Sequence, residues 1–166
     1  MTENTGEEDA VMEQETEYRQ QQISRYKQEA MPLLRYISWF ENNAGQPGSR
    51  LYQGPESTEH SIGIPVYDAT LLNFVREAGR SPLMDRNYLY TYSRGGIKTH
   101  DDERRVIAAA ELKDWDVLRG ILSKYVMGGM TKSTLWAQGV QENIFLLVLK
   151  KMQEIIEYWD QPLDIR

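Results

Sequence analysis

The segment that most constrains the fold is a strongly apolar stretch near the C-terminus. Residues 144–149 read Ile-Phe-Leu-Leu-Val-Leu and lie inside a helical pattern that runs from about Ser133 to Trp159. A helix that is apolar nearly all round has to be buried on every side. The middle of this helix is therefore predicted to lie at the centre of the domain.

Apolar residues recur with a helical period through most of the remaining chain. Pro32 lies inside one such pattern and is predicted to kink or break it. Asp68, Thr99 and Asp114 are predicted to cap the helices that follow them. In addition to the C-terminal helix, the pattern predicts helical segments over about 15–30, 32–42, 69–79, 82–94, 100–112 and 115–127. The predicted fold class is all-α, a single compact domain of about five to seven helices.

Two segments do not follow this pattern. Residues 45–65 are rich in Pro and Gly and are predicted to form a long irregular loop, within which 61–67 has the composition of a short extended piece. Residues 1–16 are acidic and contain few apolar side chains, which predicts a disordered tail or a frayed helix start. The domain is accordingly expected over residues 17–166, a length that suffices for one hydrophobic core.

The bulk composition disfavours several classes of function. The net charge is −6, so neither nucleic acid nor an anionic membrane is an expected partner. The chain contains no cysteine, which rules out disulfides and thiol chemistry and agrees with a reducing compartment. The longest apolar run is far shorter than a membrane span, and the N-terminus has no signal-peptide pattern. A cytoplasmic location is the resulting expectation.

The turn between residues 128 and 134 is the one segment with the composition of a ligand site. Gly128 and Gly129 end one predicted helix, and Thr131, Lys132 and Ser133 open the next. Backbone N–H groups at a helix start, together with a lysine and hydroxyls, attract phosphate or carboxylate. A Schellman-type helix stop followed by a Ser/Thr cap uses the same residue types and is the interpretation that we favour. No Gly directly precedes Lys132, so the segment is not a nucleotide-binding P-loop.

Catalytic and metal sites are not predicted. His100 is followed by Asp101, Asp102 and Glu103, but sequence neighbours do not share a helix face, and capping explains the acids. The second histidine, His60, stands apart in the predicted loop. No acid pair or nucleophile motif stands out, and no cofactor is expected.

The C-terminal third resembles a family of small, uncharacterised bacterial proteins, a domain of unknown function. The resemblance covers about residues 112–157 and rests on Tyr125–Lys132, Trp136, Gln141–Phe145 and Leu149–Met152, with a weaker likeness around 65–74. The family often has Gly where Asn143 stands. The resemblance implies a helical fold unit in a bacterial protein and no particular chemistry.

Two functional hypotheses follow. The first is a non-enzymatic, cytoplasmic protein-interaction module, because tyrosine and arginine commonly anchor interfaces. Its predicted surface contains Tyr90, Lys132 and Trp136, and its partner is another protein or a second copy of the chain, since the aromatic content makes a homodimer plausible. The alternative is a small-molecule or anion binder, or an enzyme, that uses the turn from Gly128 to Thr134.

Overall fold

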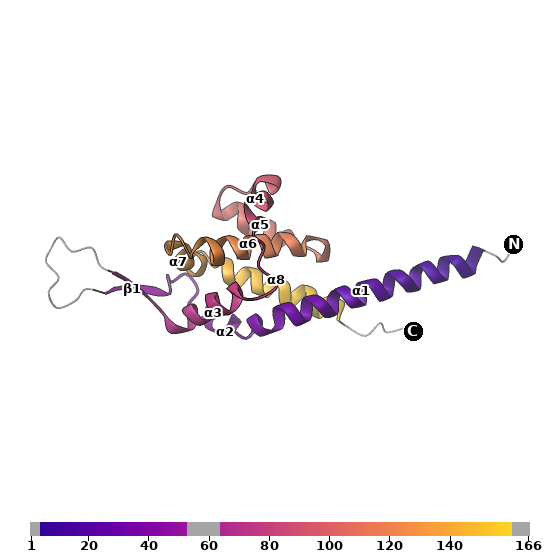
Figure 1. Cartoon of the computed structure of the whole chain (residues 1–166), viewed down its shortest axis with the longest axis horizontal. Coiled ribbons are helices and arrows are strands. Elements are labelled where there is room, and N and C mark those ends of the chain that lie inside the picture. The colour runs from indigo at the N-terminus through magenta and orange to yellow at the C-terminus, as the bar shows by residue number, and fades with distance from the viewer. Residues whose placement is uncertain (1–3, 53–63, 161–166) are drawn as a thin grey trace.

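The computed structural model describes residues 4–52 and 64–160, and Figure 1 shows their arrangement. Helix α8 (Ile144–Trp159) packs against α1 (Asn4–Leu34), α2 (Ile37–Asn42), α5 (His100–Ala109), α6 (Trp115–Gly128) and α7 (Thr134–Gln141). Helix α3 (Ala69–Gly79) packs on α6 and α1, and α4 (Tyr88–Gly95) packs on α6. A short 3₁₀ helix, η1 (Leu112–Asp114), precedes α6. The described part of the chain thus has eight α-helices, one more than the upper limit of the prediction.

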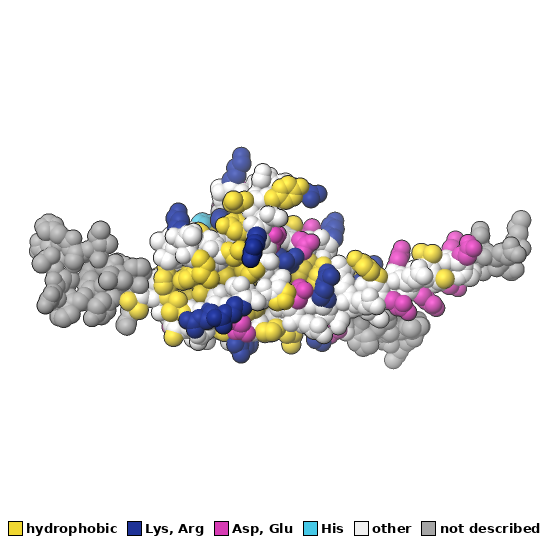
Figure 2. Space-filling view, viewed as in Figure 1, with side chains coloured by type: hydrophobic (Ala, Val, Ile, Leu, Met, Phe, Trp, Pro, Cys, Tyr) yellow, Lys and Arg dark blue, Asp and Glu magenta, His cyan; other side chains and the backbone are white. Residues whose placement is uncertain are grey.

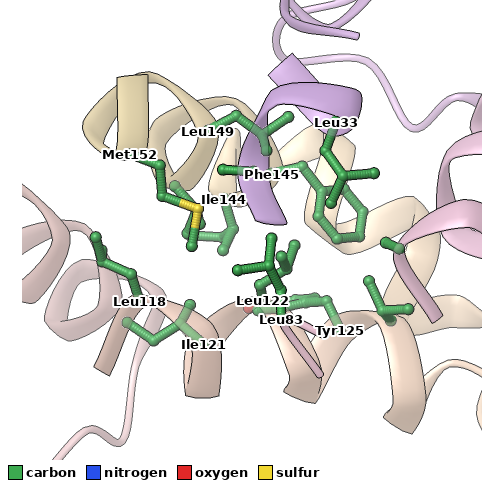
Figure 3. Close-up of a cluster of buried hydrophobic side chains, with 14 of the residues drawn as sticks. Leu33, Leu83, Leu118, Ile121, Leu122, Tyr125, Ile144, Phe145, Leu149 and Met152 are labelled. Atoms are coloured by element: carbon green, nitrogen blue, oxygen red, sulfur yellow. The ribbon is translucent and has the colours of Figure 1, made fainter. Parts of the chain in front are cut away.

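The hydrophobic core confirms the central place of the C-terminal helix. Ile144, Phe145, Val148 and Leu149 have no exposed surface. Figure 3 shows Phe145 and Leu149 of α8 among side chains of α1, α6 and the segment before α4, represented by Leu33, Leu122 and Leu83. One contiguous cluster joins α8 to these elements and to α2, α3 and α5. The described residues therefore form an all-α protein with a single compact domain.

The predicted irregular loop at 45–65 is only partly correct. Strand β1 (Ser49–Tyr52) pairs antiparallel with β2 (Ile64–Tyr67), with Ser49 opposite Tyr67. The hydroxyl of Tyr67 donates to the carbonyl of Ser133 at 2.5 Å, and this bond ties the ribbon to the start of α7. The paired residues are about 15 positions apart in the sequence, so a local sequence pattern does not predict their pairing. Residues 53–63, including His60, lie outside the described part of the chain.

The predicted C-terminal helix from Ser133 to Trp159 is in fact two helices. Asn143 separates α7 from α8 and has a φ of +60°, a left-handed conformation that asparagine tolerates better than most residues. Gly139 of α7 lies against the ring of Phe145 so closely that a β-carbon at position 139 would overlap it. The apolar pattern continues through the break, so periodicity alone predicted a single helix.

Helix α1 corrects two expectations at the N-terminus. It runs through Pro32 to Leu34 and breaks only at residues 35–36, because Ala30 and Leu33 are fully buried and hold the last turn against the core. It also begins at Asn4, inside the segment for which the sequence predicts a disordered tail or a frayed helix start. Residues 6–15 are all exposed, so this part is helical without support from the core, as an extension of an already nucleated helix.

The helix caps predicted at Asp68 and Thr99 are confirmed, whereas Asp114, at the N-cap position of α6, makes no side-chain capping bond to that helix. The carboxylate of Asp68 accepts the N–H of Thr70 at 2.8 Å at the start of α3. At α5 the hydroxyl of Thr99 accepts the N–H of Asp102, and the carboxylate of Asp102 accepts the N–H groups of Lys98 and Thr99. These backbone bonds hold the pKa of Asp102 below its ordinary value of 3.8.

We expect the contribution of Asp102 to disappear in acid. Its folded pKa lies below the unfolded value, so the stability that it adds is complete above the unfolded value and is lost as the pH falls through the folded one. In urea unfolding, Asp102→Asn should be less stable than the wild type near pH 7, and the difference should shrink at about pH 3. A difference that is independent of pH would contradict this assignment.

Candidate functional site

The predicted anion site at residues 128–134 is largely closed by its own backbone. The N–H of Gly129 donates to the carbonyl of Tyr125, that of Met130 donates to Met127, and those of Thr131 and Lys132 both donate to Gly128. These four donors therefore point at the end of α6 and not outward. The hydroxyl of Thr131 also donates to the carbonyl of Gly128, at 3.2 Å, so an anion at this turn would meet chiefly the exposed side chain of Lys132. Anion binding here stays a prediction.

The second glycine of the turn serves close packing. Gly129 has a φ of −68°, which any residue adopts, so it does not form the left-handed stop of a Schellman motif. Ser133, at the N-cap position of α7, makes no side-chain capping bond. The indole of Trp136 lies directly on Gly129, and its N–H donates to the carbonyl of Val126 at 3.1 Å. The turn is held by this contact.

The residues predicted for an interaction surface differ in availability. Tyr90 on α4 is 65% exposed, and the adjacent Leu89 is 71% exposed. Lys132 is exposed, and no ion pair to it is present among the described residues. Trp136 is half-buried, and its polar atom is bonded internally. Of the two aromatic residues in the predicted surface, Tyr90 is therefore the one whose side chain a partner could contact.

The most concentrated polar chemistry in the described residues surrounds Glu103, a glutamate that is only 1% exposed. The hydroxyls of Tyr92 and Tyr125 donate to its two carboxylate oxygens at 2.5 and 2.6 Å. The Nδ1 atom of His100 lies 2.8 Å from Oε1, and the ammonium of Lys124 lies 3.6 Å from Oε2. We call these five residues the Glu103 cluster. They connect α4, α5 and α6.

The electrostatics of the Glu103 cluster indicate a structural role. Burial raises the pKa of both phenols far above their ordinary value, and the carboxylate beside them raises it further. Both tyrosines therefore remain neutral donors to Glu103. The carboxylate of Glu103 also orients the Nδ1 atom of His100, as a carboxylate does for a histidine that acts as a general base. A general base has to reach a substrate, but none of the five residues lines the grooves beside α1 that are described below.

Sequence reasoning missed Glu103 because it assigned the acids after Thr99 to capping. The signal was present: Glu103 precedes Ile107 and Ala110 by four and seven residues, which places it on the buried face of α5. Within residues 4–52 and 64–160, no group of three or more His, Cys, Asp or Glu residues is arranged to hold a metal ion.

A second feature that was missed is the outer face of α1. Figure 1 shows the N-terminal half of this helix extending well beyond the other helices. One stripe along its whole length is exposed, at the three- and four-residue spacing of a helix surface. We call this stripe the outer face of α1. It comprises Glu7, Val11, Gln14, Tyr18, Gln21, Arg25, Gln28 and Pro32 of α1, and we include Arg35, the residue directly after the helix.

Each half of the outer face borders a groove. Val11, Gln14 and Tyr18 line one groove together with Leu112 and Lys113 of η1. Gln28, Pro32 and Arg35 line another, of about 530 Å³, together with residues of α3. We call the second one the arginine groove, because Arg76 of α3 and Arg80, the residue after α3, also line it, together with two acids, Glu29 and Glu77.

Charge is distributed unevenly over the molecule. Residues 1–17 contain seven acids and no base, so the remaining 149 residues carry 18 acids and 19 bases. The net negative charge thus resides in the projecting end of α1, where Figure 2 shows acidic side chains interspersed with apolar ones. The outer face is acidic at its N-terminal end and carries Arg25 and Arg35 at the other.

The class of protein that these observations define is an all-α domain with a long, partly free helix. No family model, curated protein or solved structure matches the chain. In the described part of the chain, no helix combines the length and apolar character that crossing a bilayer requires.

Proposed function

We propose that this protein is a non-enzymatic protein-interaction module that binds a helical partner along the outer face of α1. The observation that carries the proposal is the projecting half of α1, a regular helix with no core contact over residues 6–15. The proposal keeps the interaction class expected from the sequence and moves its surface from Tyr90 and Trp136 to α1.

Helix physics supports a bound partner. Residues 6–15 extend a helix that is already nucleated, but no contact with the core stabilises them, and most helical stability in proteins comes from packing. Val11, Tyr18 and Met31 are between 50% and 69% exposed along α1, where they leave apolar surface in water. A second helix in the grooves beside the outer face would cover part of this surface and stabilise the projecting end.

The proposal includes a location, the bacterial cytoplasm. The resemblance over residues 112–157 supports a bacterial source, and the absence of cysteine from the sequence agrees with a reducing compartment. The chemistry of the partner is complementary to α1: basic where the helix is acidic, and apolar near Val11 and Tyr18.

The test is affinity capture with the full chain as bait from a lysate of the source organism. The wild type should enrich one protein, identified by mass spectrometry, and that protein can be an untagged copy of the chain. The double variant Val11→Gln/Tyr18→Gln should lose at least about tenfold of this enrichment, because it removes apolar contacts and leaves charge and helix propensity nearly unchanged.

Met12→Gln is the matched control. Met12 is 65% exposed on the same helix but lies about 100° around it from Val11, so its replacement should leave capture unchanged. If the wild type enriches nothing relative to the double variant, the protein does not use this face, and the proposed function is wrong.

A further inference from the structure

We infer that the partner of the outer face is a second copy of this chain, with the two α1 helices packed antiparallel and crossing near Gln21. This inference rests on the proposed function, because it names the partner of the same face. It is carried by the charge pattern of α1, by the two grooves beside the helix and by the position of the polar centre of the stripe.

The charge pattern favours an antiparallel pair. Residues 4–17 of α1 contain six acids and no base, whereas residues 18–35 contain four bases and one acid. Parallel helices would place acid against acid at one end. Antiparallel helices place the acidic half of each copy against the basic half of the other, which lowers the electrostatic energy at both ends.

The arginine groove offers a place for the acidic end. In an antiparallel pair centred on Gln21, Glu7 of one copy lies level with Arg35 of the other. Arg76 and Arg80, both exposed, line the same groove as Arg35. Glu7 and Glu8 would therefore approach three arginines in a groove that also contains Glu29 and Glu77. Because Glu77 is paired with Arg35, Arg76 and Arg80 are the arginines left to meet them.

The middle of the stripe fits a symmetric crossing. Gln20, Gln21 and Gln22 form an uncharged centre between the acidic and basic halves. The buried Ala30 follows Gln21 by nine residues, which correspond to about two and a half helical turns. The two side chains therefore point in opposite directions, and Gln21 faces away from the core. A two-fold axis through this point gives a closed dimer in which both copies use the same surface.

Cysteine cross-linking tests the geometry, because the natural chain has no cysteine and each introduced thiol is unique. Gln14, Gln21 and Gln28 are matched sites, since all three are exposed glutamines on the outer face. With a short bismaleimide, Gln21→Cys should form a covalent dimer. Gln14→Cys and Gln28→Cys should each remain monomeric, because the same position in the two copies is then separated by about 21 Å along the helix axis. A mixture of these two variants should cross-link, because residue 14 of one copy lies level with residue 28 of the other.

Other cross-linking results overturn the inference. Self-linking of all three variants would show a parallel pair. If none of them links and the wild type sediments as a monomer at all concentrations, no copy binds this face. In that case, capture of a different protein by the wild type would leave the proposed function intact, and capture of nothing would remove both.

A charge exchange tests the contact with the arginine groove. The variants Glu7→Arg/Glu8→Arg and Arg76→Glu/Arg80→Glu should each dimerise at least about tenfold more weakly, because like charges then meet at both ends of the pair. Mixed together they should form a heterodimer of nearly wild-type affinity, since both contacts are again between opposite charges. Failure of the mixture to restore binding would contradict the assigned contact.

Discussion

Replacing Glu103 by alanine should lower the free energy of unfolding by about 3 kcal/mol or more, the largest effect that we expect from a single substitution here. The change leaves the buried hydroxyls of Tyr92 and Tyr125 without their acceptor and removes the counterion of Lys124. Urea unfolding monitored by circular dichroism measures the loss. Because α4 contributes no fully buried residue and packs on α6, its attachment depends heavily on this carboxylate.

Two further variants separate the role of the carboxylate from a general effect of removing an acid. Glu103→Gln keeps the side-chain length and one acceptor oxygen, so its cost should be intermediate. Glu157→Ala removes an exposed acid from α8 and should change stability by no more than about 0.5 kcal/mol. If Glu103→Ala costs no more than Glu157→Ala, the Glu103 cluster does not hold the three helices together.

Replacing Gly129 by alanine should cost about 2–3 kcal/mol. A β-carbon at this position would overlap the indole of Trp136 and lie 2.7 Å from the carbonyl oxygen of Tyr125. The indole would have to move, which would break its bond to the carbonyl of Val126. Thermal or urea unfolding of the variant measures the cost.

The neighbouring glycine and a double-mutant cycle provide the controls. A β-carbon at Gly128 would meet only the end of the flexible Leu135 side chain at 2.9 Å, so Gly128→Ala should cost less than Gly129→Ala. In Gly129→Ala/Trp136→Ala the two costs should not add, because the second change removes the group that the first displaces. Simple additivity would show that the indole is not the obstacle.

The Gly128–Thr134 turn shows how far composition can mislead. A double glycine followed by hydroxyls and a lysine is equally consistent with an anion site and with a helix stop. In the structure the turn closes on itself through four backbone N–H groups and through Trp136, seven residues after Gly129. That packing depends on side-chain shape at a distance, which residue type and spacing do not encode.

The outer face of α1 was missed for a different reason. Its acidic start was assigned to a disordered tail because few apolar residues are available there to cover a core. The first residues of α1 are nevertheless helical, because they extend a helix that the core already holds at its other end. The seven-residue spacing of Val11 and Tyr18 was the available signal.

By itself the sequence determined the all-α class, the start of α3 at Asp68, the start of α5 at Thr99 and the central place of the apolar segment 144–149, of which Ile144, Phe145, Val148 and Leu149 are buried. Each of these depends on side chains within about one helical turn of each other or on the helical period, and both are local properties. Only the tertiary structure decided the pairing of β1 with β2, the break at Asn143 and the burial of Glu103. These depend on contacts between residues distant in the chain, whose free energy outweighs local preference.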